Sequence, residues 1–360
     1  MKRSHSQAIL SLASAALLAS MLAGCSGNGN ANGGASPSPS ASSSASAASP
    51  SASPSSSPSA SAATQTEGTP SAKTDDSAAL VAAFQTKVKG GATATELNKL
   101  MDESIPQASA DAADEIVREM IAYYDTHLQD DDKPLEAEDI QQSLMNLKWP
   151  FTADQTASIK DEKARKAVED ALAGGYKLET AEGTVFLAAD YGKLKRFDAK
   201  LSPEMQDYVA LLALESDAKS AADGALVISW DELASRALAA ENFLRTYPEA
   251  KEKDAATERF NLYLEHYLIG LPNTPIFDFD TFKIAPDVKA SYEKVISEHP
   301  DSAVASLAKE LLGILQKTNG AVFTKGKNGE QVDVPEVKAF RDQLREKAEA
   351  LLAGAANPNK

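Results

Sequence analysis

A break in composition near Asp75 decides where this chain can fold. Residues 26–74 consist mainly of Ser, Ala, Pro, Gly and Asn, and they contain no Leu, Ile, Val or aromatic side chain. Such a segment cannot bury enough apolar surface to offset the entropy lost when it becomes ordered. We therefore expect residues 25–74 to be a disordered spacer and the folded body of this 360-residue chain to begin near residue 75.

Residues 1–24 have the order of residues found in a secretory signal. Lys2 and Arg3 provide a positive start, an apolar run follows from Ile9 to Leu22, and small residues come next. This run is shorter than the about 20 residues that a membrane-spanning helix needs. We therefore predict a signal peptide over residues 1–24.

The four residues Leu22-Ala23-Gly24-Cys25 resemble the lipobox of bacterial lipoproteins. The resemblance implies cleavage between Gly24 and Cys25, and a diacylglyceryl group on the sulfur of Cys25. Two acyl chains hold a protein stably at a bilayer, whereas one holds it weakly. We therefore expect a chain anchored by lipid in the cell membrane, on its extracytoplasmic face. The alternative is an ordinary signal peptide that is cut to release a soluble protein.

A flexible spacer of this length would average about 40 Å from end to end and could extend to roughly 160 Å. It could lift the body away from the membrane and into a cell wall, or it could be a low-complexity tail with no length requirement. This long Ser/Ala/Pro spacer after a lipobox resembles the spacers of lipoproteins from single-membrane bacteria. We therefore expect the protein to come from a bacterium of that kind.

Charge and cysteine content exclude several kinds of partner. The chain has 36 basic and 52 acidic side chains and a net charge of −16, and loss of Lys2 and Arg3 with the signal makes it −18. An acidic body is a poor partner for nucleic acid and gains nothing from anionic lipids. Cys25 is the only cysteine, so no disulfide can form within the chain and a packed core must provide the stability.

From residue 75 onward, apolar residues recur at the three- and four-residue spacing of a helix with one buried face. The strongest stripe comprises Ile116, Val117, Met120, Ile121, Tyr124 and Leu128. We predict a mostly all-α body over residues 75–355, arranged as a helical-hairpin array or bundle; two subdomains, 75–225 and 226–355, are an alternative. Alternating patterns predict two short β-hairpins, Tyr176–Thr180 with Thr184–Leu187 and Ala321–Lys327 with Glu330–Val334. We expect Asn328-Gly329 to form a tight turn in the second hairpin.

Two capping boxes are predicted from Ser or Thr followed three residues later by Gln or Glu. Thr152 and Gln155 precede a charged helix, in which Asp161 with Arg165 and Glu162 with Lys166 have the favourable four-residue spacing. Ser229 and Glu232 predict a second helix start.

A repeat of 52 residues relates two stretches of the C-terminal half. Phe243, Pro248, Ala256, Phe260 and Leu262 recur as Val295, Pro300, Ala308, Leu312 and Ile314. Each copy reads as helix, Pro turn, helix, and resembles the tetratricopeptide-type hairpins of some bacterial envelope proteins. The spacing exceeds the usual about 34 residues, because residues 269–286 are inserted. Two unrelated helical hairpins are the alternative.

Phe277-Asp278-Phe279-Asp280-Thr281 resembles the nucleophile loop of haloacid-dehalogenase-type phosphatases. The Gly expected before Thr281 is missing, and the remaining chain lacks the α/β pattern that would have to follow. We therefore expect Phe277 and Phe279 to fix this loop on the helices while the two Asp side chains face water.

Other patterns also lack the features of a catalytic or metal site. The loop from Gly320 to Lys327 has the wrong glycine spacing for phosphate binding, and Asp130–Asp132 lack the calcium-loop pattern, so we expect a solvated turn there. The three histidines beyond the signal, His127, His266 and His299, are far apart, and His299 is expected to pack beside its turn. We expect Trp149 and Trp230 to be core anchors rather than ligand-stacking platforms.

These observations predict no catalytic residue, metal or cofactor. The function they favour is a membrane-anchored helical binding or scaffolding module that holds a protein or peptide in a groove between helical hairpins. A substrate-binding lipoprotein of an importer is one alternative, which requires two α/β lobes. An envelope enzyme with an unrecognised site is another.

Overall fold

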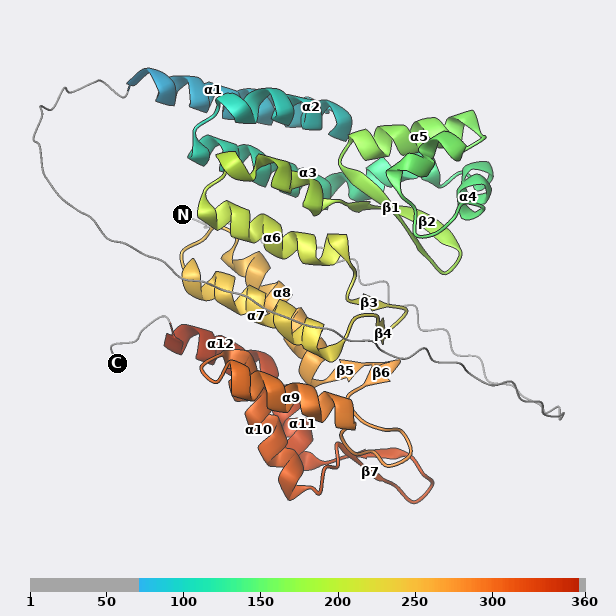
Figure 1. The fold of residues 1–360 in the computed structure, drawn as a ribbon, viewed down its shortest axis with the longest axis vertical. Helices are drawn as coiled ribbons and strands as arrows, with labels where there is room; N and C mark the ends of the chain where they lie inside the picture. The colour runs from blue at the N-terminus through green and yellow to red at the C-terminus, as the bar shows by residue number, and fades with distance from the viewer. Residues whose placement is uncertain (1–70, 356–360) are drawn as a thin grey trace, which may run out of the picture. The chain divides into compact units, whose positions relative to one another are not determined.

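The computed structural model describes residues 71–355. The expected signal peptide, Cys25 and nearly all of the expected spacer lie outside the described residues. Within them, the chain is mostly helical, with only two-stranded antiparallel sheets (Figure 1). The predicted fold class is therefore confirmed.

Helices with an apolar stripe make up most of the first half of this body. Its elements are α1 (Ser71–Lys89), α2 (Ala94–Ser104), α3 (Ala110–Asp132), α4 (Glu138–Met145), α5 (Glu162–Ala173), β1 (Tyr176–Ala181), β2 (Thr184–Ala189) and α6 (Pro203–Asp217). Segments of 3₁₀ helix lie between several of them, and the longest, Tyr191–Lys200, precedes α6. In α3 the predicted stripe is buried as far as Tyr124, with Ile116, Val117 and Met120 fully enclosed, and Leu128 is partly buried.

The second half consists of longer helices and short hairpins. Its elements are β3 (Ala221–Ala222), β4 (Ala225–Leu226), α7 (Trp230–Thr246), α8 (Lys253–Leu268), β5 (Gly270–Leu271), β6 (Thr274–Pro275), α9 (Pro286–Glu298), α10 (Ala303–Lys317), β7 (Phe323–Lys325), β8 (Gln331–Asp333), α11 (Pro335–Asp342) and α12 (Leu344–Ala355). The helices of both halves share one hydrophobic core. Figure 1 shows α6 between α3 and α7, and α6 packs directly on α7.

The positions of the 52-residue repeat are equivalent in two helix–turn–helix pairs, α7–α8 and α9–α10. Phe243 and Val295 are buried in the first helices, and Ala256 and Ala308 are buried in the second. Tyr247 and His299 end the first helices with similar backbone angles, φ −125° and −132°. The two pairs therefore share a local geometry around their Pro turns.

The helix starts differ from the prediction in detail. Thr152 and Gln155 do form a capping box, but it begins a 3₁₀ segment, Ala153–Ser158. Asp161 is the N-cap of α5 and accepts from the backbone N–H of Ala164. Arg165 pairs instead with Glu169, at 3.8 Å, so the predicted pairing of Asp161 with Arg165 is wrong.

The pairing of Glu162 with Lys166 is also wrong, because Lys166 instead binds Asp170 at 2.9 Å. Ser229 caps α7 as predicted, by accepting from the N–H of Glu232. The Glu232 carboxylate does not complete the box, since it pairs with Arg236 at 3.1 Å. A buried guanidinium thus competes successfully for the side chain that would have closed the box.

Both predicted β-hairpins are present. In β1–β2 the loop residues Glu182 and Gly183 have φ of 49° and 77°, as a two-residue turn of this handedness requires. The loop of β7–β8 is wider than predicted, because the Gly326 N–H bonds to the Glu330 carbonyl and only Gly329 has a positive φ. Two further hairpins, β3–β4 and β5–β6, have strands of two residues, which are too short to show alternation in a sequence.

Candidate functional site

The predicted lipidation residue, Cys25, and its cleavage partner Gly24 lie outside the described residues, so both remain predictions. Among residues 71–355, no helix is long and apolar enough to cross a membrane. The three histidines lie in separate places, and the described part of the chain contains no group of three His, Cys, Asp or Glu side chains placed to hold a metal ion.

The Asp278 loop is stabilised by its own side chains. The Asp278 carboxylate accepts from the N–H and hydroxyl of Thr281, both at 2.9 Å, and these bonds lower the pKa of Asp278. Phe277 is buried as predicted, but Phe279 is 58% exposed and does not fix the loop on the helices. The carboxylate thus ends its turn in the way of a capping residue.

The three acids Asp130–Asp132 do not form the predicted solvated turn. They belong to the last turn of α3. Of the three, only Asp130 is mainly exposed, and it pairs there with Lys133. Asp131 accepts from the hydroxyl of Tyr176 at 2.6 Å, and Asp132 accepts from the backbone N–H of Leu187 at 2.8 Å. Their role is to attach the β1–β2 hairpin to α3.

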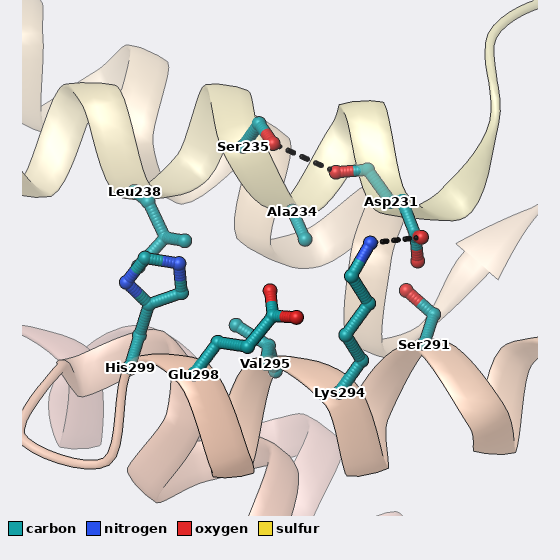
Figure 2. Close-up of a pocket in the computed structure, with 9 residues that line it drawn as sticks. All are labelled: Asp231, Ala234, Ser235, Leu238, Ser291, Lys294, Val295, Glu298 and His299. Atoms are coloured by element: carbon teal, nitrogen blue, oxygen red, sulfur yellow. Dashed lines mark hydrogen bonds and ion pairs between the residues drawn. The ribbon is translucent and has the colours of Figure 1, made fainter. Parts of the chain in front are cut away.

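A narrow groove lies between α7 and α9, the first helices of the two repeated pairs. Figure 2 shows Lys294 of α9 extending to Asp231 of α7, and the two form an ion pair of 2.7 Å. The hydrogen bond from Lys294 lowers the pKa of Asp231. His299, which was expected to pack beside its turn, is exposed and lines this groove. The groove encloses about 40 Å³, which is room for water rather than for a peptide.

A larger depression lies beside the β1–β2 hairpin. Its volume is about 590 Å³, which is within the usual range of ligand pockets. Four consecutive residues of β1, 177–180, line it. Because alternate side chains of a strand point to opposite faces, a depression that touches four in succession lies along the edge of the strand. β2 occupies one edge of β1, so the depression follows the other.

The outer edge of β2 is covered by side chains. The amide of Gln141 donates to the Val185 carbonyl at 2.7 Å and accepts from the Val185 N–H at 2.9 Å. Asp132 accepts from Leu187, and burial raises the pKa of this carboxyl. These two side chains take the place of a neighbouring strand.

The outer edge of β1 is open by contrast. Val185 and Leu187 direct their backbone groups away from β1, so each belongs to a non-hydrogen-bonded pair of the hairpin. Their partners in register are Thr180 and Leu178, whose N–H and C=O groups therefore also point outward. Within residues 71–355, no hydrogen bond engages these four backbone groups. They face the depression.

An aromatic pair forms one wall of the depression. The ring centroids of Trp149 and Phe151 are 6.2 Å apart, and both side chains are partly buried. Trp230 is buried in the core as predicted, but Trp149 also lines this surface site. The Nε1 of Trp149 is buried and has no partner in the described part of the chain. The non-periodic sequence Trp149-Pro150-Phe151 could have indicated a loop with aromatic side chains available at the surface.

The charged side chains around the depression are mostly paired with each other. Lys177 contacts Glu179 at 2.6 Å and donates to the carbonyl of Ser216 at the end of α6. Asp217 pairs with Lys195 at 3.1 Å. The site therefore offers an apolar wall and free backbone groups rather than a strong field of one sign.

No family model, curated protein or solved structure matches this chain. The geometry of the depression is thus the basis for any functional conclusion.

Proposed function

We propose that this protein is a lipid-anchored binding module at the extracytoplasmic face of the cell membrane, and that its helical body holds a segment of a partner protein. The observation that supports the binding role is the depression beside β1, which combines an aromatic wall with an open strand edge. Its balance of apolar and polar contacts is typical of sites that bind peptides. The anchor is supported by the Leu22–Cys25 sequence alone.

An importer-type binding protein is less well supported. That function requires two lobes built on parallel sheets with a cleft between them, whereas residues 71–355 contain only two-stranded antiparallel sheets.

Binding can be tested with a photo-crosslinking amino acid at position 151 in intact cells. Phe151 lies in the wall of the depression, so we expect discrete adducts with one or a few proteins. The matched control is the same amino acid at Phe279, which is exposed but lies on another loop. Equal adducts at both positions, or none at position 151, would count against a binding site beside β1.

The anchor is tested by Cys25→Ala. Without the thiol, no diacylglyceryl group can be attached, so we expect the chain to move from the membrane fraction to the soluble fraction or to remain unprocessed. Mass analysis of the wild-type N-terminal peptide should show the lipid. Membrane retention of the processed Ala variant would contradict the anchor.

A further inference from the structure

We propose that the outer edge of β1 binds an extended segment of a partner protein as an added β-strand. This inference rests on the proposed function and specifies how the partner is held. The four free groups, N–H and C=O of Leu178 and of Thr180, are spaced as an extended backbone requires, since they belong to residues i and i+2 of one strand. A second strand in this position could satisfy all four.

The contrast between the two edges of the hairpin supports this assignment. Folded proteins cover or block free strand edges, because an uncovered edge pairs with other chains. Here β2 is covered by Gln141 and Asp132, while the neighbouring edge opens into a depression of about 590 Å³. The carbonyl of Tyr176, at the start of β1, accepts from Lys193 at 3.2 Å. The free part of the edge is therefore limited to Leu178–Thr180.

The side chains around the edge indicate which segment would fit. An added strand presents alternate side chains to opposite sides, so every second residue can approach the aromatic pair of Trp149 and Phe151. The nearby charges are already neutralised by pairing, as in Lys177 with Glu179. We therefore expect an extended segment with an apolar residue at alternate positions and no requirement for high charge.

The chain's own spacer does not meet this requirement. Residues 26–70 contain no Leu, Ile, Val or aromatic side chain and carry several prolines that lack an N–H. A second copy is also a poor occupant, because its β1 lies in the same recess between Trp149–Phe151 and Ser216–Lys219. A second copy would have to bring these lining residues with its strand into the depression, whereas a lone extended segment would not. The occupant is thus a segment of a different protein.

The test uses the full-length chain and a display library of short random peptides. The tightest-binding peptide is synthesised, and its binding to the wild type is compared with Thr180→Pro and Thr180→Val. Proline removes the outward N–H without removing a backbone bond between β1 and β2, so we expect affinity to fall by about tenfold or more. Both substitutions also remove the bond from the Thr180 hydroxyl to the Thr184 carbonyl, at 3.1 Å. Valine keeps the N–H and removes only the hydroxyl, so its affinity should match the wild type. Circular dichroism and the melting temperature verify that both variants are folded.

Two measurements on the wild type avoid any dependence on how the variants fold. N-methylation of the peptide, one residue at a time, should weaken binding at alternate residues only, because alternate N–H groups face β1. Bound peptide should also slow amide hydrogen exchange at Leu178 and Thr180.

Several results would overturn the inference. Equal binding by Thr180→Pro, or N-methyl effects without a two-residue period, would reject strand addition while adducts at position 151 still supported a binding module. Tighter binding after deletion of residues 26–70 would identify the spacer as the occupant. A dimer abolished by Thr180→Pro would identify a second copy. Failure to recover any peptide, together with no adduct at position 151, would reject the proposed function as well.

Discussion

Glu241 is 3% exposed, and its two carboxylate oxygens accept from backbone N–H groups at the start of a different helix. The bonds to Ala303 and Val304 are 2.7 and 3.1 Å long, and Arg245 pairs with the same carboxylate at 2.7 Å. A helix N-terminus has unsatisfied N–H groups and a partial positive charge, both of which favour an acid. One side chain on α7 therefore fixes the start of α10.

We predict that Glu241→Ala lowers the free energy of unfolding by about 2 kcal/mol, because two buried N–H groups lose their acceptors. Urea unfolding measures the change. Glu249→Ala is the control, since Glu249 is exposed in the adjoining turn and its loss should cost less than about 0.5 kcal/mol. A similar small loss for Glu241→Ala would show that water replaces the carboxylate without cost.

His266 gives the stability a dependence on pH. Burial lowers its pKa, although the charges of Glu215 and Glu265 act in the opposite direction. As the pH falls through the ordinary histidine value of about 6.5, the unfolded chain takes up a proton that the folded chain resists. The free energy of unfolding should therefore decrease just below this pH.

The prediction is that His266→Gln reduces this decrease, measured by urea unfolding at about pH 7.5 and about pH 5.5. Carboxyl groups whose pKa is lowered on folding, such as Glu115 and Asp231, contribute only at more acid pH. An equal loss of stability in the wild type and the variant would contradict the role given to His266.

At the scale of elements, the β1–β2 hairpin depends on a side chain that imitates a strand. Gln141 of α4 satisfies both backbone groups of Val185. We predict that Gln141→Ala lowers the free energy of unfolding by about 1 to 2 kcal/mol, because the N–H and C=O of Val185 lose their partners. Gln142→Ala is the matched control: the neighbouring amide is exposed and reaches only Glu138, at 3.3 Å. Equal effects in the two variants would show that the edge of β2 does not need Gln141.

Periodicity was sufficient to predict the helices but not the contacts of their ends. The stripe on α3 and the alternation around Glu182-Gly183 are local, and both elements formed as expected. The choice of Arg236 as partner for Glu232, and of Tyr176 as partner for Asp131, depends on residues brought together only by folding. A local capping pattern gives no information about such competing partners.

The candidate binding site could not be predicted for a related reason. Alternation predicts that a hairpin forms, but it does not indicate which edge is covered. Covering β2 requires Gln141 and Asp132, which lie 44 and 55 residues before the β2 residues that they bind and have no strand-like pattern. Trp149 was also difficult to assign from sequence, because one large aromatic side chain can pack against the core and line a surface depression at the same time.

For the whole molecule, the question is whether residues 75–225 and 226–355 are two subdomains or one unit. The contacts between these two halves bear on the answer. The guanidinium of Arg118 on α3 pairs with the buried carboxylate of Glu252 before α8, and Lys251 pairs with Glu115 at 2.9 Å. Tyr247 donates to Asp207 of α6 at 2.8 Å. Together with the shared hydrophobic core, these contacts favour one cooperative unit.

Each half contains one tryptophan, so the cooperativity can be measured directly. In Trp230→Phe the fluorescence reports on Trp149 in the first half, and in Trp149→Phe it reports on Trp230 in the second. We predict that the single tryptophan signal of each variant follows one transition, with the same urea midpoint as the circular dichroism of that variant. Arg118→Ala should move both signals together, by about 2 kcal/mol or more, because it leaves Glu252 buried without its charge partner. Lys251→Ala, which removes an exposed partner, should move them by less than about 1 kcal/mol. Separate midpoints for Trp149 and Trp230, or a shift confined to one of them, would show that the two halves unfold independently.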